Sequence, residues 1–178
     1  MITSNGARVH DQDDNLMYAK NLPVDLVQSV VDVLKQDPEI FIHIYMNDEW
    51  LLNREDETMK NFHDQTGFTY RLYDVDNAPT EGIAKIFCTH PNQEHEHLVP
   101  FEDKLNEQFG DKLNIAFSTP WCLEVMAAEV SKGDALQAVA QSIDLELENC
   151  IAFGDGMNDV ELLSICLLYT SDAADDTC

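Results

Sequence analysis

A short, wholly apolar run that leads directly into a polar, glycine-containing loop constrains this chain more than any other feature. Residues 150–153 read Cys-Ile-Ala-Phe, and residues 154–159 read Gly-Asp-Gly-Met-Asn-Asp. An all-apolar run of this kind is typical of a strand buried on both faces of a parallel sheet. Apolar residues at helical spacing predict a helix after Ser131 and another from about Val160. We therefore expect an open α/β sheet, in which ligands bind beyond the carboxyl ends of the strands.

The middle of the chain alternates between helical and strand patterns. Helices are predicted at about 23–34, 55–66 and 98–109. Strands are predicted at 40–46, 50–52, 70–75, 83–89, 113–118 and 122–126. The strand at 40–46 is apolar on both faces, which favours a central position in its sheet. Residues 1–20 are predicted to form short strands joined by tight turns.

The charge balance excludes one class of partner. The chain has 10 Lys and Arg against 34 Asp and Glu, a formal net charge of −24, so it would repel the phosphate backbone of a nucleic acid. No apolar run approaches the roughly 18 residues of a membrane helix. The first residues lack the features of a secretory signal, so we expect a cytoplasmic protein with no membrane partner. The odd number and wide spacing of the 5 cysteines indicate reduced thiols.

Two carboxylates, Asp155 and Asp159, flank Asn158 in the loop that follows the apolar run. Oxygen ligands of this kind suit Mg²⁺, which proteins hold with one or two carboxylates together with water and phosphate oxygens. The loop is therefore a candidate for half of a magnesium site. The alternative interpretation is that Asp159 only caps the following helix and that Asp155 is only a surface residue of a turn.

Lys132 adds a cation at the start of the helix that Ser131 precedes. The free backbone N–H groups of a helix start favour an anion, and an ammonium group adds a point charge suited to phosphate. The alternative interpretation is a solvated surface lysine. The lysine, the acid-rich loop and the predicted α/β fold together suggest phosphoryl transfer.

Three segments resemble a known family. They are Ile-Thr-Ser-Asn-Gly-Ala at 2–7, Ser-Lys-Gly-Asp-Ala-Leu at 131–136 and Phe-Gly-Asp-Gly-Met-Asn-Asp at 153–159. Together they closely resemble the haloacid dehalogenase-like phosphatases of the Cof type. The nearest members are bacterial enzymes that hydrolyse sugar phosphates and pyridoxal phosphate. The resemblance runs from Met1 to about Ser164.

The resemblance implies a role for each matching residue. Lys132 would bind the phosphate and stabilise the nucleophile, and Asn158 would contact the phosphate. Asp155 would bind Mg²⁺, and Asp159 would support the metal through hydrogen bonds from the second coordination sphere. Residues Asn5 and Gly6 would match the Asn-Gly turn near the mouth of the active site.

The resemblance also implies a domain organisation. Residues 1–21 would be a core segment and linker, 22–116 an α/β cap domain of the Cof (C2B) type, and 117–165 the C-terminal part of a Rossmann-like core with a parallel sheet. Residues 166–178 carry no recognisable turn signal, and they do not continue the pattern of the helix predicted from about Val160. We expect them to be a non-native tail outside the fold.

The family's nucleophile motif, Asp-x-Asp-Gly-Thr, does not occur in this sequence. Residues 11–14 are superficially similar, but they lack the Gly-Thr and a preceding buried strand, so they are predicted to form a hairpin turn. The chain is therefore expected to be an inactive fragment of an enzyme that hydrolyses small phosphorylated metabolites through an aspartyl-phosphate. The alternative function is a non-catalytic α/β module that binds a protein partner.

A second group of metal-ligating residue types lies between the predicted strand at 83–89 and the helix at 98–109. It consists of Cys88, His90, His95 and His97. Their spacing fits no standard zinc pattern, so a metal role is disfavoured.

Overall fold

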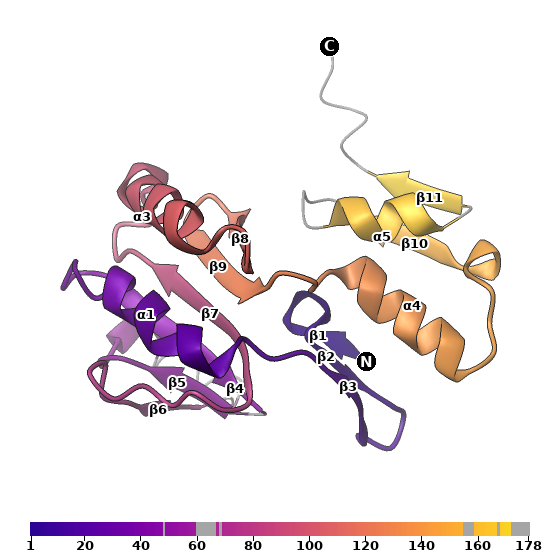
Figure 1. The fold of residues 1–178 in the computed structure, drawn as a ribbon, viewed down its shortest axis with the longest axis horizontal. Helices are drawn as coiled ribbons and strands as arrows, with labels where there is room; N and C mark the ends of the chain where they lie inside the picture. The colour runs from indigo at the N-terminus through magenta and orange to yellow at the C-terminus, as the bar shows by residue number, and fades with distance from the viewer. Residues whose placement is uncertain (48, 60–66, 68, 155–158, 167, 172–178) are drawn as a thin grey trace, which may run out of the picture. The chain divides into compact units, whose positions relative to one another are not determined.

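The computed structural model describes residues 1–47, 49–59, 67, 69–154, 159–166 and 168–171. The chain divides into two compact units. The first unit combines Met1–Lys20 with Glu129–Cys178, and the second unit is Asn21–Ala128. The first unit is therefore built from both ends of the chain, with the second unit inserted between them (Figure 1).

The second unit is built on a 6-stranded sheet in the order β6-β5-β4-β7-β9-β8. Its strands are β4 (Phe41–Met46), β5 (Glu49–Leu52), β6 (Tyr70–Leu72), β7 (Ile83–Thr89), β8 (Leu113–Thr119) and β9 (Cys122–Ala127). Neighbouring strands are antiparallel except β5 and β6, which are parallel. The prediction of a central strand at 40–46 is confirmed, because β4 pairs with β5 on one side and β7 on the other.

Helices α1 (Val24–Leu34) and α3 (His95–Phe109) cover one face of this sheet (Figure 1). Their inward residues, such as Val30 and Leu105, are fully buried in one hydrophobic core with Ile42, Ile44 and Ile86 of the strands. The helix predicted at 55–66 falls largely outside the described residues. The α/β character predicted for this part of the chain is confirmed, and its core is closed by its own elements.

The opposite face of the sheet carries charged and aromatic side chains, since residues alternate between faces along a strand. Lys85 of β7 and Glu124 of β9 form an ion pair of 2.7 Å whose side chains are only 12% and 6% exposed. His43 of β4 stacks on Phe87 with 4.2 Å between ring centroids. Its Nδ1 accepts a hydrogen bond of 3.1 Å from the Trp50 indole N–H. Burial, and secondarily the charge of Lys85, lowers the pKa of His43 to about 3.

The N-terminal part of the first unit is an antiparallel sheet of β1 (Ile2–Thr3), β2 (Arg8–His10) and β3 (Leu16–Ala19), with the short helix η1 (Ser4–Gly6) after β1. A turn joins β2 to β3. Its Asp11 carboxylate accepts hydrogen bonds from the backbone N–H groups of Asp13 at 2.8 Å and Asn15 at 2.9 Å. The prediction that 11–14 form a hairpin turn is confirmed.

The C-terminal part of the first unit follows the predicted order of helix, strand, loop and helix. Its elements are α4 (Lys132–Ser142), η2 (Leu147–Asn149), β10 (Ile151–Gly154), α5 (Val160–Ile165) and β11 (Leu168–Ser171). Strands β10 and β11 are parallel, which confirms the prediction of a parallel sheet here.

Three expectations are corrected. The boundary placed between 116 and 117 falls inside β8, because β8 and β9 pair as a hairpin that completes the sheet of the second unit. Residues 166–178 were expected outside the fold, but Leu168–Ser171 form β11 because their backbone pairs with β10. The run at 150–153 is not buried on both faces: Ala152 is 4% exposed, while Ile151 and Phe153 are 61% and 71% exposed.

The described cysteines are all free thiols: Cys88, Cys122, Cys150 and Cys166. That these thiols are reduced in the cell stays a prediction. Within the described residues, none of the helices has the length and apolar character needed to cross a membrane.

Candidate functional site

The turn at Ser4–Gly6 brings the N-terminal segment against the start of α4. Ser4, Asn5 and Gly6 all have left-handed backbone angles, with φ of 50°, 53° and 104°. A Cβ atom on Gly6 would lie 2.1 Å from the Ser131 carbonyl oxygen and 3.2 Å from the Lys132 nitrogen. Only glycine permits this approach, because the contacted atoms are backbone and the φ angle is unfavourable for other residues.

Ser131 and Asp134 build the start of α4. The Ser131 hydroxyl accepts a hydrogen bond of 3.0 Å from the Asp134 backbone N–H, and donates one of 2.8 Å to the Asp134 carboxylate. Ser131 therefore acts as the N-cap residue, with an acid at the third helical position as in a capping box. This arrangement sets Lys132 as the first residue of α4.

Lys132 is joined to the end of the loop that follows β10. Its ammonium group forms an ion pair with the Asp159 carboxylate. The side chain of Asp159 is 6% exposed, and that of Lys132 is 29% exposed. Asp159 occupies the N-cap position of α5 but makes no capping hydrogen bond with its side chain. The interpretation of Asp159 as a simple helix cap is therefore wrong.

Two further glycines allow the segments around this ion pair to pack closely. A Cβ atom on Gly133 would lie 3.0 Å from the Glu161 backbone, so α4 and α5 approach each other at their N-terminal ends. A Cβ atom on Gly154, the last residue of β10, would lie 2.5 Å from the Cβ of Asp159. Because both glycines lack a side chain, Asp159 can lie beside β10, and α4 can pack beside α5.

The structure brings together three of the predicted segments. The Asn5-Gly6 turn, Lys132 and Asp159 meet at the start of α4, although they lie far apart in the sequence. Asp155 and Asn158 lie outside the described residues, so the contacts predicted for them stay predictions. The ion pair with Asp159 places the Lys132 ammonium at the end of the same loop.

The second group of metal-ligating residue types comes together only in part. The Nδ1 atoms of His90 and His97 lie 3.2 Å apart, while His95 contacts the Pro120 carbonyl oxygen and Cys88 is buried in the hydrophobic core. In the part of the chain that the structure describes, three or more His, Cys, Asp or Glu side chains are nowhere grouped so that they could hold a metal ion.

Two basic residues of the first unit make contacts that the sequence did not predict. Arg8 is 3% exposed, and its guanidinium donates hydrogen bonds of 2.9 Å and 3.2 Å to the carbonyl oxygens of Ala7 and Lys20. Lys20 pairs with Glu129, which raises the pKa of the lysine and lowers that of the glutamate. Spacing does not reveal these contacts, because their partners are backbone atoms or residues distant in sequence.

The described residues supply only part of a magnesium site at the loop. Asp159 supplies a buried carboxylate of the right chemistry, but its Oδ1 atom already accepts the Lys132 ammonium. It could therefore support a metal from the second coordination sphere, and the direct ligand would have to be Asp155. The described arrangement is a lysine ammonium paired with a buried carboxylate at the N-terminus of an 11-residue helix.

Comparisons with known proteins identify the family of this chain. The family model described as haloacid dehalogenase-like hydrolase matches residues 1–169. A Haemophilus influenzae protein provisionally named a phosphatase is 42% identical over 164 residues, which cover 92% of this chain and 60% of that protein. A Yersinia pestis protein named HMP-PP phosphatase is 37% identical over 164 residues, covering 92% of this chain and 59% of its own length. The chain thus spans about 60% of the length of these relatives.

Solved structures share the fold. An HAD subclass IIB sugar phosphatase superposes on 96% of this chain and 62% of its own, with a TM-score of 0.78 and 17% identity. That identity supports the fold alone. The family match over residues 1–169, which include the Asn5-Gly6 turn, Lys132 and Asp159, carries the assignment further. The chain belongs to the family of haloacid dehalogenase-like hydrolases.

Proposed function

We propose that this chain is the cap and the lysine-bearing part of the core of a magnesium-dependent phosphatase. Its substrates would be small phosphate monoesters, such as sugar phosphates or pyridoxal phosphate, in the cytoplasm. The observation that carries the proposal is the convergence of the Asn5-Gly6 turn, Lys132 and Asp159 at the start of α4. The phosphatase names of the relatives and of the solved neighbour support the reaction class.

Lys132 would bind the oxygens of the phosphate group. The positive end of the α4 helix dipole would favour the same anion. The buried Asp159 carboxylate would hold the ammonium in place, so that the charge needs no reorientation when negative charge develops on the transferred oxygens. Asn158 and the Asn5-Gly6 turn would provide further phosphate contacts.

Asp155, with support from Asp159, would hold magnesium, and the bound ion would supply positive charge that offsets the negative charge of the reacting groups. The attacking carboxylate would belong to an Asp-x-Asp-Gly-Thr motif and would form an aspartyl-phosphate that water then hydrolyses. This motif is absent from the sequence, so we expect the chain alone to turn over no phosphate ester. The second unit would act as the cap that selects the substrate.

A thermal denaturation experiment tests the metal site. Magnesium should raise the midpoint of the first unit's transition, because only the folded loop offers an assembled carboxylate site. Asp155→Ala should abolish this shift, while Asp144→Asn, which changes an exposed acid in the same unit, should leave it intact. Equal shifts in all three proteins would contradict the proposal. Hydrolysis of p-nitrophenyl phosphate that Asp155→Ala abolishes would contradict the predicted inactivity of the chain.

A second candidate function is a non-catalytic module that binds a protein partner. The observation that favours it is that the second unit forms one hydrophobic core from its own elements. The magnesium experiment separates the two functions, because an interaction module has no reason to be stabilised by the cation.

A further inference from the structure

Two histidines of the second unit lie against each other where β7 leads into α3. The chain makes a tight turn after β7, because the Gln93 backbone N–H donates a hydrogen bond of 2.9 Å to the His90 carbonyl oxygen. Helix α3 begins shortly afterwards, and His97 lies in its first turn. The Nδ1 atoms of His90 and His97 lie 3.2 Å apart, with 4.2 Å between the ring centroids. The turn therefore places two nitrogens that can bind a metal side by side.

A carboxylate stands beside the outer nitrogen of each imidazole. The Nε2 atom of His90 lies 3.8 Å from a carboxylate oxygen of Glu39, and that of His97 lies 3.3 Å from one of Glu94. A histidine that binds a metal through one ring nitrogen commonly donates the N–H of the other nitrogen to a carboxylate, which orients the ring and raises its basicity. Both outer nitrogens are therefore placed as they are in metal-bound histidines.

The two rings cannot satisfy all of these contacts while both are neutral. The Asn92 backbone N–H donates a hydrogen bond of 3.3 Å to the Nδ1 atom of His90, so this nitrogen carries a lone pair. If the Nδ1 atom of His97 carries a lone pair as well, two lone pairs face each other across 3.2 Å. If it carries the proton instead, the lone pair of Nε2 faces the Glu94 carboxylate. A positive charge removes the conflict, either as a second proton on His97 or as a cation bound between the rings.

The spacing of the two nitrogens suits a metal ion. Two nitrogen ligands of a tetrahedral zinc ion, each about 2.0–2.1 Å from the metal, lie about 3.3–3.4 Å apart. The observed separation of 3.2 Å is close to this value. Imidazole suits zinc, copper and nickel, whereas magnesium and calcium prefer oxygen ligands. His90 is buried and His97 is exposed, so an ion would reach the pair from the side of His97.

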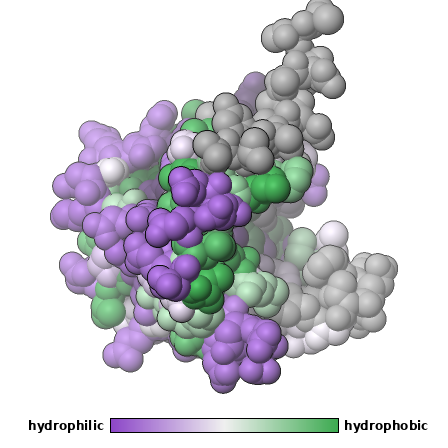
Figure 2. Space-filling model, turned by 90° about the vertical axis from the view of Figure 1, so that its right-hand side faces the viewer, coloured by the Kyte–Doolittle hydropathy of each residue, from purple (hydrophilic) through white to green (hydrophobic). Residues whose placement is uncertain are grey.

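The charge of the chain favours cations in general. Figure 2 shows hydrophilic side chains, in purple, over much of the face that it displays, and the formal net charge is −24. A field of this sign raises the local concentration of any cation, so it does not select one metal. The selection would come from the imidazole ligands.

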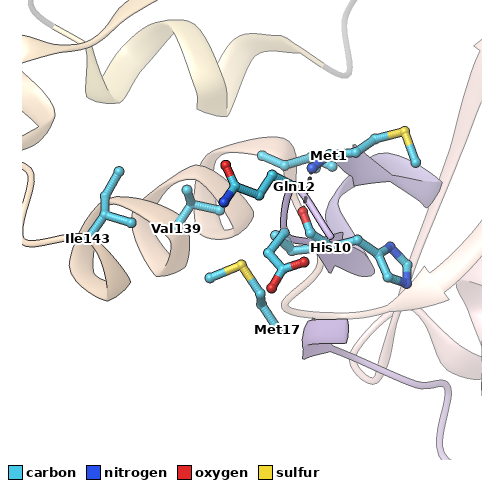
Figure 3. A pocket seen from close by; sticks show the side chains of 9 residues that line it. Met1, His10, Gln12, Met17, Val139 and Ile143 are labelled. Atoms are coloured by element: carbon cyan, nitrogen blue, oxygen red, sulfur yellow. Dashed lines mark hydrogen bonds between the residues drawn. The ribbon is translucent and has the colours of Figure 1, made fainter. Parts of the chain in front are cut away.

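The pocket between α4 and the hairpin of β2 and β3 is a weaker candidate (Figure 3). Its volume is about 580 Å³, and its walls include the apolar side chains of Met1, Met17 and Val139. Its described lining contains one imidazole, that of His10. A single imidazole supplies a metal ion with one nitrogen ligand, so the pocket does not match the histidine pair.

We propose that His90 and His97 form a binding site for a divalent transition-metal ion of the zinc type. The Nδ1 atom of each ring would be a ligand, and water would fill the remaining coordination positions. The carboxylates of Glu39 and Glu94 would orient the two rings, and the ion would replace the long hydrogen bond from Asn92. The bound ion would connect the turn after β7 to the first turn of α3. This site uses none of the residues invoked in the proposed function.

A calorimetric titration of the full chain with zinc tests the proposal. The solution contains excess magnesium, which occupies carboxylate sites because it prefers oxygen ligands. We expect zinc to bind, and His97→Gln to lower the affinity at least about tenfold, because it removes one of the two ligands. Glu94→Gln should lower the affinity by a smaller factor, since it removes only the group that orients the His97 ring. Both residues are exposed, so neither variant should unfold the chain, and circular dichroism checks this.

His95→Gln is the matched control. His95 is an exposed histidine of the same helix turn, and its Nδ1 atom contacts the Pro120 carbonyl oxygen, so its loss should leave the affinity for zinc unchanged. Zinc should also shift the ring-proton NMR signals of His90 and His97, but not those of His95.

Three results would overturn the proposal. The first is the absence of zinc binding, which would leave a proton as the charge that the two rings share. The second is an affinity that His95→Gln lowers as much as His97→Gln does. The third is zinc binding that Asp155→Ala abolishes and His97→Gln leaves intact, which would assign the ion to the loop after β10. Because magnesium stabilisation is measured separately with Asp155→Ala, failure of this site and failure of the proposed function are distinguishable.

Discussion

The two units of this chain differ in how far their apolar residues are buried. In the second unit, α1 and α3 cover one face of the sheet and bury residues such as Ile42 and Leu105 completely. In the first unit, Ile151 and Phe153 stay largely exposed on a strand of equally apolar composition. An apolar residue is buried only if another element of the structure covers it. The second unit contains its covering helices, whereas no described element of the first unit covers Ile151 and Phe153.

The largest expected effect concerns the buried ion pair of the second unit. Lys85→Met leaves the buried Glu124 carboxylate without this cation, and we expect the free energy of unfolding to fall by about 3–5 kcal/mol. Urea unfolding followed by tryptophan fluorescence measures this, because Trp50 and Trp121 both lie in the second unit. The double variant Lys85→Met/Glu124→Leu removes both charges and should recover most of the loss.

Lys35→Met is the control for that measurement. Lys35 pairs with Asp32 and Asp76 at the surface, where its side chain is 33% exposed, so its loss should cost less than about 1 kcal/mol. If both lysine variants lose the same stability, burial is not what makes the Lys85–Glu124 pair important.

The next effect should be confined to the first unit. In Gly6→Ala, the new methyl group would meet the Ser131 carbonyl oxygen at a φ of 104°, and we expect a local loss of about 2–4 kcal/mol. Hydrogen exchange of the α4 amides should accelerate, while the tryptophan-detected transition of the second unit should not move. A shift of that transition would show that the two units unfold as one.

Gly67→Ala is the matched control. Gly67 also has a positive φ, of 72°, but no atom of the described residues lies within 4 Å of the position of its Cβ. It should show only the backbone cost of about 1–2 kcal/mol. If Gly67→Ala loses as much stability as Gly6→Ala, the close approach of Gly6 to Ser131 does not explain the effect of Gly6→Ala.

The smallest effect is a pH dependence of the second unit. The pKa of His43 is about 3 in the folded chain and 6.5 without burial. Between these values the unfolded state binds a proton that the folded state does not, so stability falls as the pH drops below 6.5. From pH 6.5 to 5 the loss should be about 1.6 kcal/mol. The urea midpoint should follow this slope, and His43→Gln should flatten it.

Local patterns predicted the elements of this chain well. The predicted strand at 83–89 coincides with β7, and the predicted helix after Ser131 is α4. Pro23, Ser131 and Gly110 mark helix ends in the sequence as they do in the structure. These features depend on backbone restrictions and on capping groups within a few residues, so they can be derived without knowledge of the fold.

The candidate site was predictable as a set of residue types but not as a set of contacts. Lys132 and Asp159 were both identified, yet their ion pair was not. It depends on Gly133 and Gly154, which let the segments of α4, α5 and β10 approach each other. The structural contacts of Arg8 and Lys20 were missed for the same reason, since their partners are set by tertiary packing.

By itself, the sequence determined the α/β class, the family to which the chain belongs, and the lysine and acidic loop that carry the candidate chemistry. Only the tertiary structure decided that β8 and β9 belong to the second unit, that Asp159 pairs with Lys132, and that Ile151 and Phe153 are exposed. The physical reason is the range of the interactions. Helix caps, turns and apolar periodicity act over a few residues, whereas burial and ion pairing depend on which distant segments meet.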